Sequence, residues 1–355
     1  MGVDLRHGGN RQAAADALGC RPSQLLDASA SLAPWTPFCP SLSKASLRDY
    51  PDRDQGSLRQ AIAAIHGLSP DSVLPGNGAA ELFTWAARDA AATGLSGLLA
   101  PGFADYRRAL QCWDAALLET PLALPWDQAG PLPHPPLEGA VAWICNPHNP
   151  TGQLWSRASI EAMIERHALV ICDEAFLPLV PEAESQSMIA LVAEHPNLVV
   201  VRSLTKLFGV AGLRIGYAIA QPDRLKRWSE WRDPWPVNGI AAALAEQWLG
   251  SLGRYTRWCN RVQRWTAKEG KWMQRELARI PGIEPMPSSA NFFLISGRCS
   301  LVPLREELEQ NHRILLRDCR SFAGLGERWL RIGLQSPRDN RRIARALKQV
   351  QRLSC

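Results

Sequence analysis

The sequence predicts an α/β fold, with a mainly parallel β-sheet covered by helices on both faces and followed by a smaller α+β domain. Three observations lead to this class. Short runs rich in β-branched residues alternate with segments of helical periodicity over the first two thirds of the chain. Conspicuous polar residues follow these runs, at the edge where such a sheet binds its ligand. After Pro234-Trp235-Pro236 the alternation gives way to a long helical region, so we expect a small domain from Val237 onward.

Composition is that of an ordinary globular protein. The 355 residues are enough for about two domains, and the hydrophobic and charged fractions are 46% and 21%. Forty basic and 34 acidic residues give a net charge of +6 without a basic block. We therefore expect no nucleic-acid partner, and a modest positive field that favours anionic small molecules.

The cysteines and the apolar segments bear on two questions: in which compartment the protein is found, and whether it binds a metal. The nine cysteines include no CxxC pair, which argues against a disulfide framework and against a zinc site, so no metal is expected. No segment reaches the roughly 18 uninterrupted apolar residues of a membrane span, and the N-terminus lacks an apolar signal core. We expect a cytoplasmic protein without a membrane partner.

The chain begins with an arm, residues 1–40, that contains a short helix near Arg11–Leu18. The motif HGGN at His7–Asn10 precedes it, and on its own it is most simply a glycine turn with an incidental histidine. A helix with one apolar stripe follows at Gly56–His66. The chain then turns sharply at Pro75–Gly78 into another helix. Such a turn exposes backbone N–H groups at the positive end of the helix dipole, which is an anion site, although a plain strand-to-helix turn explains it equally well.

The sheet and the small domain follow from periodicity. Helices are predicted to begin at Phe103 and to span Ser159–His167, and the strands at Gly97–Pro101, Ala140–Cys145, Ala168–Asp173, Leu198–Val201 and Arg214–Ala220. A long helical region from Asn238 to Arg279 has a candidate break near Gly253. The rest of the small domain comprises strands at Asn291–Ser296 and Trp329–Gly333, a helix near Pro303–Gln310 and an amphipathic helix at Arg338–Arg352.

The stretch Leu198–Ala220 carries the main chemical signal. Lys206 lies in a predicted loop between two strands, near Ser203 and Thr205 and eight residues before Arg214. Desolvation and a nearby cation lower the pKa of a lysine, and the neutral amine can form a Schiff base with a carbonyl cofactor. For an isolated lysine, a side chain that extends from the end of a strand to the solvent is the better explanation. The residues around Lys206 therefore decide between this explanation and a Schiff-base lysine.

Those neighbours match the needs of a phosphorylated pyridine aldehyde. Asp173 ends a hydrophobic strand, where a protonated ring nitrogen would neutralise its carboxylate. The Gly78-Ala79-Ala80 turn, Ser203 and Arg214 supply donors for a phosphate, and Asn149 supplies one for a phenolic oxygen. Each residue has a plainer role, such as a helix cap for the aspartate or a structural ion pair for the arginine. Their coincidence at consecutive strand ends favours the cofactor hypothesis.

The motifs NPHNPTG, ICDEAF and SLTKLFGVAGLRIGY resemble the signatures of the fold-type I pyridoxal-phosphate enzymes of the class I/II aminotransferase group. The resemblance extends over almost the whole chain. It implies pyridoxal 5'-phosphate as cofactor, Lys206 as the catalytic Schiff-base lysine, Asp173 as partner of the pyridine nitrogen and Asn149 as donor to O3′. It also implies that Phe103 stacks on the cofactor and that Tyr50 reaches the phosphate of a neighbouring subunit, in a homodimer with its sites at the interface.

One residue departs from the aminotransferase pattern. Most members have a tyrosine three residues after the aspartate, as a second donor to O3′, and this chain has Phe176. Together with HGGN, DASASLAPW, YPDRDQGSLRQAIA and RILLRDCRSFAGLGERWLRIGL, this departure resembles the threonine-phosphate decarboxylase family of cobalamin synthesis. The alternative is the sister family of histidinol-phosphate aminotransferases, which shares the cofactor residues.

The decarboxylase resemblance implies a carboxy-lyase that acts on a small phosphorylated amino acid. It overturns the plain interpretation of the HGGN turn. His7, Asn291, Arg317 and Arg331 would share the phosphate and the carboxylate of the substrate, and which arginine takes which anion stays open. The expected division is an arm at 1–40 that contributes to the substrate site, a cofactor domain at 41–236 and a small domain at 237–355. A non-catalytic protein that kept the fold is a third hypothesis, which the intact cofactor residues disfavour.

Overall fold

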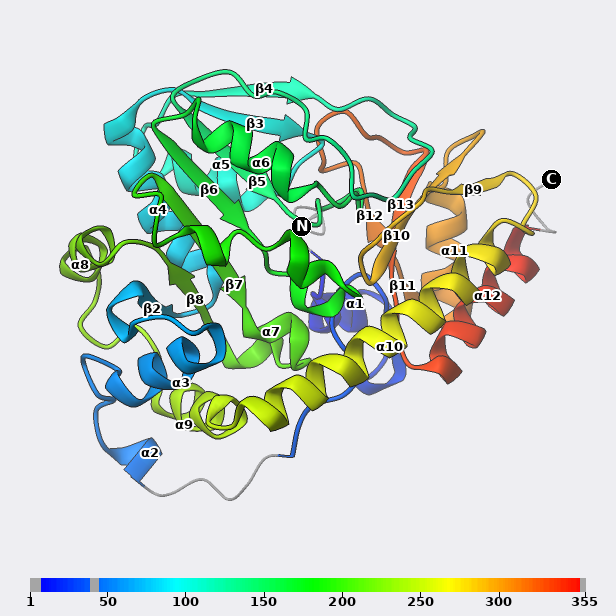
Figure 1. The fold of residues 1–355 in the computed structure, drawn as a ribbon. Coiled ribbons are helices and arrows are strands. Elements are labelled where there is room, and N and C mark those ends of the chain that lie inside the picture. Colours follow the sequence, from blue (N-terminus) through cyan, green and yellow to red (C-terminus); the bar gives the residue numbers. More distant parts are fainter. Residues whose placement is uncertain (1–7, 39–44, 352–355) are drawn as a thin grey trace.

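The computed structural model describes residues 8–38 and 45–351, so His7 lies outside the described residues. A large twisted sheet and a smaller sheet each carry their own helices, and the long helix α10 runs from one toward the other (Figure 1). Within the described residues, no helix is both long and apolar enough to cross a membrane.

The large sheet has seven strands in the order β2-β8-β7-β6-β5-β3-β4. Only β8 is antiparallel to its neighbours, β2 and β7, which confirms the mainly parallel sheet. The strands β2 and β4 escaped prediction because proline, glycine and glutamate give them weak β-propensity. The bounds are β2 (Val73–Gly76), β3 (Ser96–Ala100), β4 (Leu117–Pro121), β5 (Val141–Cys145), β6 (Leu169–Asp173), β7 (Leu198–Ser203) and β8 (Gly216–Ile219).

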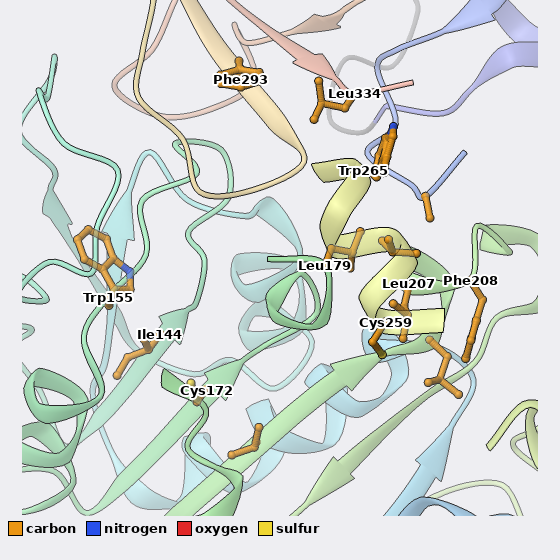
Figure 2. Packing of buried hydrophobic residues seen from close by; sticks show 14 of the residues in the cluster. Ile144, Trp155, Cys172, Leu179, Leu207, Phe208, Cys259, Trp265, Phe293 and Leu334 are labelled. Carbon is orange, nitrogen blue, oxygen red and sulfur yellow. The ribbon is translucent and has the colours of Figure 1, made fainter. Parts of the chain in front are cut away.

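Helices cover both faces of this sheet, as predicted, and the alternation along β5 shows how. Trp143 packs with α4 (Ala79–Thr93), α5 (Ala104–Gln111) and α8 (Pro222–Trp231) in one hydrophobic cluster, whereas Ile144 packs with α6 (Arg157–Ile164) and α10 (Leu252–Leu277) in the other. Figure 2 shows part of the second cluster, from Ile144 and Cys172 to Cys259 and Trp265 of α10. Every residue of β5, β6 and β7 is buried, which explains their continuous apolar runs.

The predicted α-helices agree with the observed ones to within a few residues, whereas α2, α7 and α8 were not predicted. Their bounds are α1 (Arg11–Ala17), α2 (Ala45–Arg48), α3 (Gly56–His66), α4 (Ala79–Thr93), α5 (Ala104–Gln111), α6 (Arg157–Ile164), α7 (Leu204–Leu207), α8 (Pro222–Trp231), α9 (Gly239–Leu249), α10 (Leu252–Leu277), α11 (Val302–His312) and α12 (Pro337–Gln351). Single 3-10 turns lie at η1 (Pro22–Gln24), η2 (Pro70–Ser72), η3 (Leu177–Leu179), η4 (Ala183–Gln186), η5 (Ile189–Leu191) and η6 (Ala211–Leu213).

The break in the long helical region lies slightly earlier than predicted. α9 ends at Leu249, and Ser251 has extended backbone angles, φ −146° and ψ 112°, that start α10 afresh. Gly253 is therefore inside the first turn of α10 and does not interrupt it. The buried side of α10 recurs at helical spacing, with Tyr255, Cys259 and Val262 among its members.

A smaller sheet, β12-β13-β10-β9, is antiparallel throughout. Its strands are β9 (Ile283–Pro285), β10 (Phe292–Gly297), β12 (Arg317–Asp318) and β13 (Trp329–Gly333). The described part of the N-terminal arm is attached to this region, because β1 (Leu26–Asp27) pairs in parallel with β11 (Ile314–Leu315). The Gly333 N–H also donates to the Ala28 carbonyl at 2.8 Å. These contacts place the residues after β1 beside β13.

Candidate functional site

A cavity of about 200 Å³ lies at the carboxyl ends of β5, β6 and β7, between the large sheet, the small sheet and the arm. It is the position that a mainly parallel sheet offers to a ligand. The cavity brings together most of the predicted site residues. Those that line it are Ala79, Ala80, Phe103, Asn149, Asp173, Ser203, Lys206, Arg214, Arg317 and Arg331.

Lys206 lies in the short helix α7 rather than in the predicted loop. Ser203 is extended, and the Phe208 N–H closes one helical turn by donating to the Leu204 carbonyl at 3.0 Å. Gly209 follows with φ +65°, and a Cβ there would lie 2.6 Å from the Ala33 carbonyl oxygen, so a larger residue would separate this turn from the arm. The turn therefore holds the lysine in a fixed position after β7.

The amine of Lys206 loses its proton far more readily than an ordinary lysine. Burial, then the guanidiniums of Arg331 and Arg214, lower its pKa from 10.5 to about 8, and the Asp173 carboxylate opposes them. The Nζ atom lies 5.6 Å from the centroid of the Phe176 ring. A desolvated lysine beside other cations is an activated nucleophile toward carbonyl carbon.

Asp173 is a buried carboxylate at the end of β6 that would benefit from a cation. Its Oδ1 accepts from the Ala175 N–H at 2.9 Å, and its Oδ2 accepts from the Tyr106 hydroxyl at 2.5 Å. Burial raises its pKa to about 6, although both hydrogen bonds and Lys206 oppose the rise. A protonated ring nitrogen would relieve the remaining desolvation penalty.

Asn149 is oriented by Arg331. Arg331 donates from Nη1 to the Asn149 side-chain oxygen and from Nη2 to the Ser29 carbonyl at 3.1 Å. With its oxygen engaged in this way, the Asn149 NH₂ group is the part that can donate to a ligand. The sequence indicated both residues and did not predict this contact between them.

The N-terminus of α4 forms one part of the cavity wall. Ala79 and Ala80 are in its first turn, where backbone N–H groups lack partners within the helix. Gly78 precedes them with φ +75°, and a Cβ on it would lie 2.5 Å from Nη2 of Arg214. Ser203 shares a 2.7 Å hydrogen bond with the hydroxyl of Thr205. The glycine thus lets a guanidinium approach the helix terminus, and the two together form an anion site.

Two arginines of the small sheet, Arg317 and Arg331, also line the cavity. Arg317 on β12 and Arg331 on β13 are directly paired in register, an arrangement of like charges that an anion between them would stabilise. Arg317 donates from Nη2 to the Ser321 hydroxyl at 2.7 Å and lies over the Phe322 ring. Burial and then Arg317 lower the pKa of Arg331 to about 10. The pair can bind one dianion or two separate anionic groups.

Three predicted residues do not line the cavity. Asn291 is buried beside β10, and neither polar atom of its amide has a hydrogen-bond partner among the described residues. Tyr50 is 79% exposed and stacks on Trp235 with centroids 4.5 Å apart. Gly78 contributes through Arg214, as described above. Gly8 lines the cavity, and it directly follows His7, which lies outside the described residues.

The sequence did not predict several residues of the site. Ser29, Ser31 and Phe322 line the cavity, and Tyr106, which does not line it, reaches Asp173 from α5. The Ser31 hydroxyl is buried and has no partner among the described residues, so it is available to a ligand. The only signal in the sequence was the alternation of serines in DASAS and the aromatic pair Phe103 and Tyr106 at a helix start.

A buried ion pair lies under the cavity, on the other face of the sheet; we call it the floor of the site. Glu174 and Arg202 are both at most 1% exposed and lie 2.6 Å apart, and they directly adjoin Asp173 and Ser203 in the chain. Glu174 also accepts from the Met188 N–H at 2.7 Å. Because successive strand residues point to opposite faces, this pair fixes the ends of β6 and β7 from beneath the cavity. Within the described residues, no group of three or more metal-ligating side chains is present.

The chain is similar to known proteins of one family. A family model described as aminotransferase class I and II matches residues 25–348. The chain is 32% identical to threonine-phosphate decarboxylase of Salmonella typhimurium, with 97% of this chain and 96% of that protein covered. It is 33% identical to histidinol-phosphate aminotransferase of Symbiobacterium thermophilum, over 86% of this chain and 83% of that protein. The solved L-threonine-O-3-phosphate decarboxylase of Porphyromonas gingivalis superposes with a TM-score of 0.73 at 27% identity, covering 86% of this chain and 91% of that chain.

Proposed function

Since the chain belongs to the aminotransferase class I and II family, whose cofactor is pyridoxal phosphate, we propose that it is an L-threonine O-3-phosphate decarboxylase. Its products would be CO2 and (R)-1-amino-2-propanol O-2-phosphate, a step in cobalamin synthesis. The similarity to the Salmonella enzyme over nearly the whole of both chains carries this proposal. The relative named for cobalamin biosynthesis in Leptospira interrogans, at 26% identity, supports the pathway, although this chain spans only 41% of it.

The residues of the cavity fit pyridoxal phosphate. Asp173, a buried carboxylate with a raised pKa, would pair with the ring nitrogen, and Lys206, whose pKa is lowered, would supply a neutral amine for the aldehyde. The first turn of α4 with Arg214 and Ser203 would hold the phosphate, and Asn149 would donate to O3′. When bound, the cofactor supplies an electron sink for the bonding pair released at the substrate Cα.

The arginine pair suits a substrate with two anionic groups. L-Threonine phosphate carries a phosphate and a carboxylate on a short carbon chain, and Arg317 and Arg331 face the cavity from adjacent strands. His7, on the arm beside Gly8, and the unpartnered Ser31 hydroxyl would add donors at the same end. Asn291, which is buried and does not line the cavity, is the remaining residue proposed to help bind the substrate anions. These groups would orient the substrate so that its Cα–carboxylate bond is the one that breaks.

Lys206 or a water would complete the reaction. Once the carboxylate has left as CO2, Cα needs one proton, which would come from a water or from Lys206 after it has taken a proton from the substrate ammonium; the Lys206 Nζ atom lies 5.6 Å from the centroid of the Phe176 ring. A tyrosine at position 176 would put a hydroxyl near this amine. The phenylalanine there instead leaves an apolar wall, and its ring packs on Phe292 with 5.1 Å between centroids. We take this apolar wall as support for decarboxylation over transamination.

The second candidate is histidinol-phosphate aminotransferase, which the 33% identity to the Symbiobacterium protein favours. That match leaves 14% of the present chain uncovered, against 3% for the decarboxylase. Both candidates use the same cofactor residues, so the substrate side decides between them.

We further propose a cytoplasmic homodimer in which Tyr50 completes the phosphate site of the second subunit. Tyr50 is 79% exposed although its ring stacks on Trp235, so its side chain is accessible to a second subunit, and this exposure supports the proposal. The division into arm, cofactor domain and small domain at 1–40, 41–236 and 237–355 belongs to the same proposal.

Two parallel assays test the function. Purified holoenzyme is incubated with L-threonine phosphate alone, and separately with histidinol phosphate and 2-oxoglutarate. We expect kcat/KM for CO2 release in the first assay to exceed that for glutamate formation in the second by at least about a hundredfold. Turnover of histidinol phosphate without CO2 release from threonine phosphate would reject the proposal in favour of the aminotransferase.

A further inference from the structure

Tyr106 is a buried side chain that contacts two residues of the cofactor site at once. Its hydroxyl donates to Oδ2 of Asp173 at 2.5 Å, and its ring meets the Phe103 ring edge-on, with centroids 5.4 Å apart and planes at 86°. Phe103 and Asp173 are the residues expected to stack on the cofactor and to pair with its ring nitrogen. Tyr106 itself does not line the cavity, so it would act only through them.

The ring of Tyr106 is clamped by aromatic packing. Phe83 of α4 meets it edge-on at 5.1 Å, Trp143 of β5 lies 5.3 Å away, and the residue is only 5% exposed. This packing fixes the direction of the hydroxyl and leaves Asp173 as its acceptor. Burial and the carboxylate hold the Tyr106 pKa well above 10, so the hydroxyl stays a donor.

Other groups near this carboxylate oxygen are poor substitutes. The Cys145 Sγ atom lies 3.9 Å from Oδ2, and burial raises the pKa of its thiol, which is a weak donor. The Ala175 N–H bonds the other oxygen at 2.9 Å. Tyr106 is therefore the strong donor that fixes the rotamer of Asp173 and stabilises its charged form.

We propose that Tyr106 is a positioning residue: its hydroxyl holds the Asp173 carboxylate ionised and aimed at the ring nitrogen of pyridoxal phosphate. The proposal rests on the role proposed for Asp173 in the cofactor site, and it is independent of which substrate is turned over. It predicts that Tyr106 matters for a cofactor only if that cofactor has a ring nitrogen to pair with.

Cofactor binding by two variants tests this directly. The apoprotein is titrated by tryptophan fluorescence with pyridoxal phosphate and with the analogue whose ring nitrogen is replaced by carbon. In Tyr106→Phe, which keeps the clamped ring, we expect the Kd for pyridoxal phosphate to rise about tenfold and the Kd for the analogue to change less than about threefold. Tyr217→Phe is the matched control, because Tyr217 on β8 is likewise a buried tyrosine but bonds His66 at 2.9 Å; it should change neither Kd.

The possible results separate the proposals. Equal losses for both cofactors in Tyr106→Phe would show a merely structural role and overturn the inference. If the wild type does not prefer pyridoxal phosphate over the analogue, the role of Asp173 fails and the inference fails with it. A retained preference in Tyr106→Phe overturns only the role of Tyr106, and none of these results depends on threonine phosphate.

A measurement on the unsubstituted residue covers the case in which Tyr106→Phe does not fold. The chain has four tyrosines, so labelling with 3-fluorotyrosine gives four ¹⁹F resonances that the variants at the other three positions assign. We expect the Tyr106 resonance to shift when pyridoxal phosphate binds and to shift less with the analogue. Equal shifts with both cofactors would contradict the proposal.

Discussion

Replacing Lys206 by methionine is expected to stabilise the cofactor-free protein near neutral pH. Burial, Arg331 and Arg214 lower the pKa of this amine from 10.5 to about 8. At about 1.4 kcal/mol for each pH unit, that difference corresponds to roughly 3 kcal/mol in favour of the neutral amine. The side chain is partly open to the cavity, and Asp173 loses a favourable cation in the variant, so we expect a gain of about 1–2 kcal/mol at pH 7.

The sign of the pH dependence follows from the same pKa. The folded-state pKa of Lys206 lies below the unfolded value, so the unfolded state binds more protons between pH 8 and pH 10.5. The stability of the wild type therefore gains from this group as the pH rises through that window, and the full penalty is present below pH 8. The advantage of Lys206→Met should shrink as the pH approaches 10.5.

Urea denaturation of the apoprotein at pH 7 and at pH 10 measures this difference. Lys268→Met, at an exposed lysine of α10, is the matched control and should be neutral at both pH values. A Lys206→Met variant that is less stable than the wild type at pH 7, or whose advantage is the same at both pH values, would refute the reasoning.

Three further predictions concern the floor, the phosphate end and the substrate end of the site. Glu174→Gln should lower the free energy of unfolding by about 2 kcal/mol, because it removes a buried charged hydrogen bond to Arg202 while Arg202 keeps Glu184 as a second partner, whereas Glu161→Gln at a part-exposed helical pair should lower it by less than about 0.5 kcal/mol; urea midpoints compare the two. Gly78→Ala should raise the Kd for pyridoxal phosphate at least about tenfold, since its Cβ would lie 2.5 Å from a guanidinium nitrogen; Gly67→Ala, with a similar φ and no described atom within 4 Å, controls for backbone strain in the same titration. Arg331→Met should raise KM for L-threonine phosphate at least about tenfold in steady-state kinetics, because it removes a charged hydrogen bond.

Each of these has a contrary result. Equal destabilisation by the two glutamine variants would mean that the buried pair adds nothing beyond a surface one. Equal loss of cofactor affinity in the two alanine variants would assign the effect to strain rather than to the anion site. An unchanged KM in Arg331→Met would remove that arginine from the substrate site.

The sequence predicted the large sheet and most of the residues that line the cavity because both depend on local patterns. Continuous apolar runs indicate strands buried on both faces, and a polar residue at the end of such a run, like Asp173, or four residues after it, like Asn149, lies at the ligand-binding edge. Lys206 was found in the same way, although its loop turned out to be a helical turn.

The rest of the site depends on contacts between distant segments. The hydrogen bond from Tyr106 to Asp173 spans 67 residues, and that from Arg331 to the Ser29 carbonyl spans 302. The buried pair of Glu174 and Arg202 likewise joins two strands. No local periodicity encodes which of these side chains meet, so the sequence indicated some of the residues without their partners. The roles of His7, Tyr50 and Asn291 stay predictions.

The fate of the substrate carboxyl carbon tests the central claim most directly. L-Threonine phosphate labelled with ¹³C in that position is added to holoenzyme without any 2-oxo acid, and labelled CO2 is measured against substrate consumed. A decarboxylase releases one labelled CO2 for each substrate molecule through many turnovers. Consumption that stops at one equivalent per active site, with the label retained in a 2-oxo acid, would contradict the account and identify an aminotransferase.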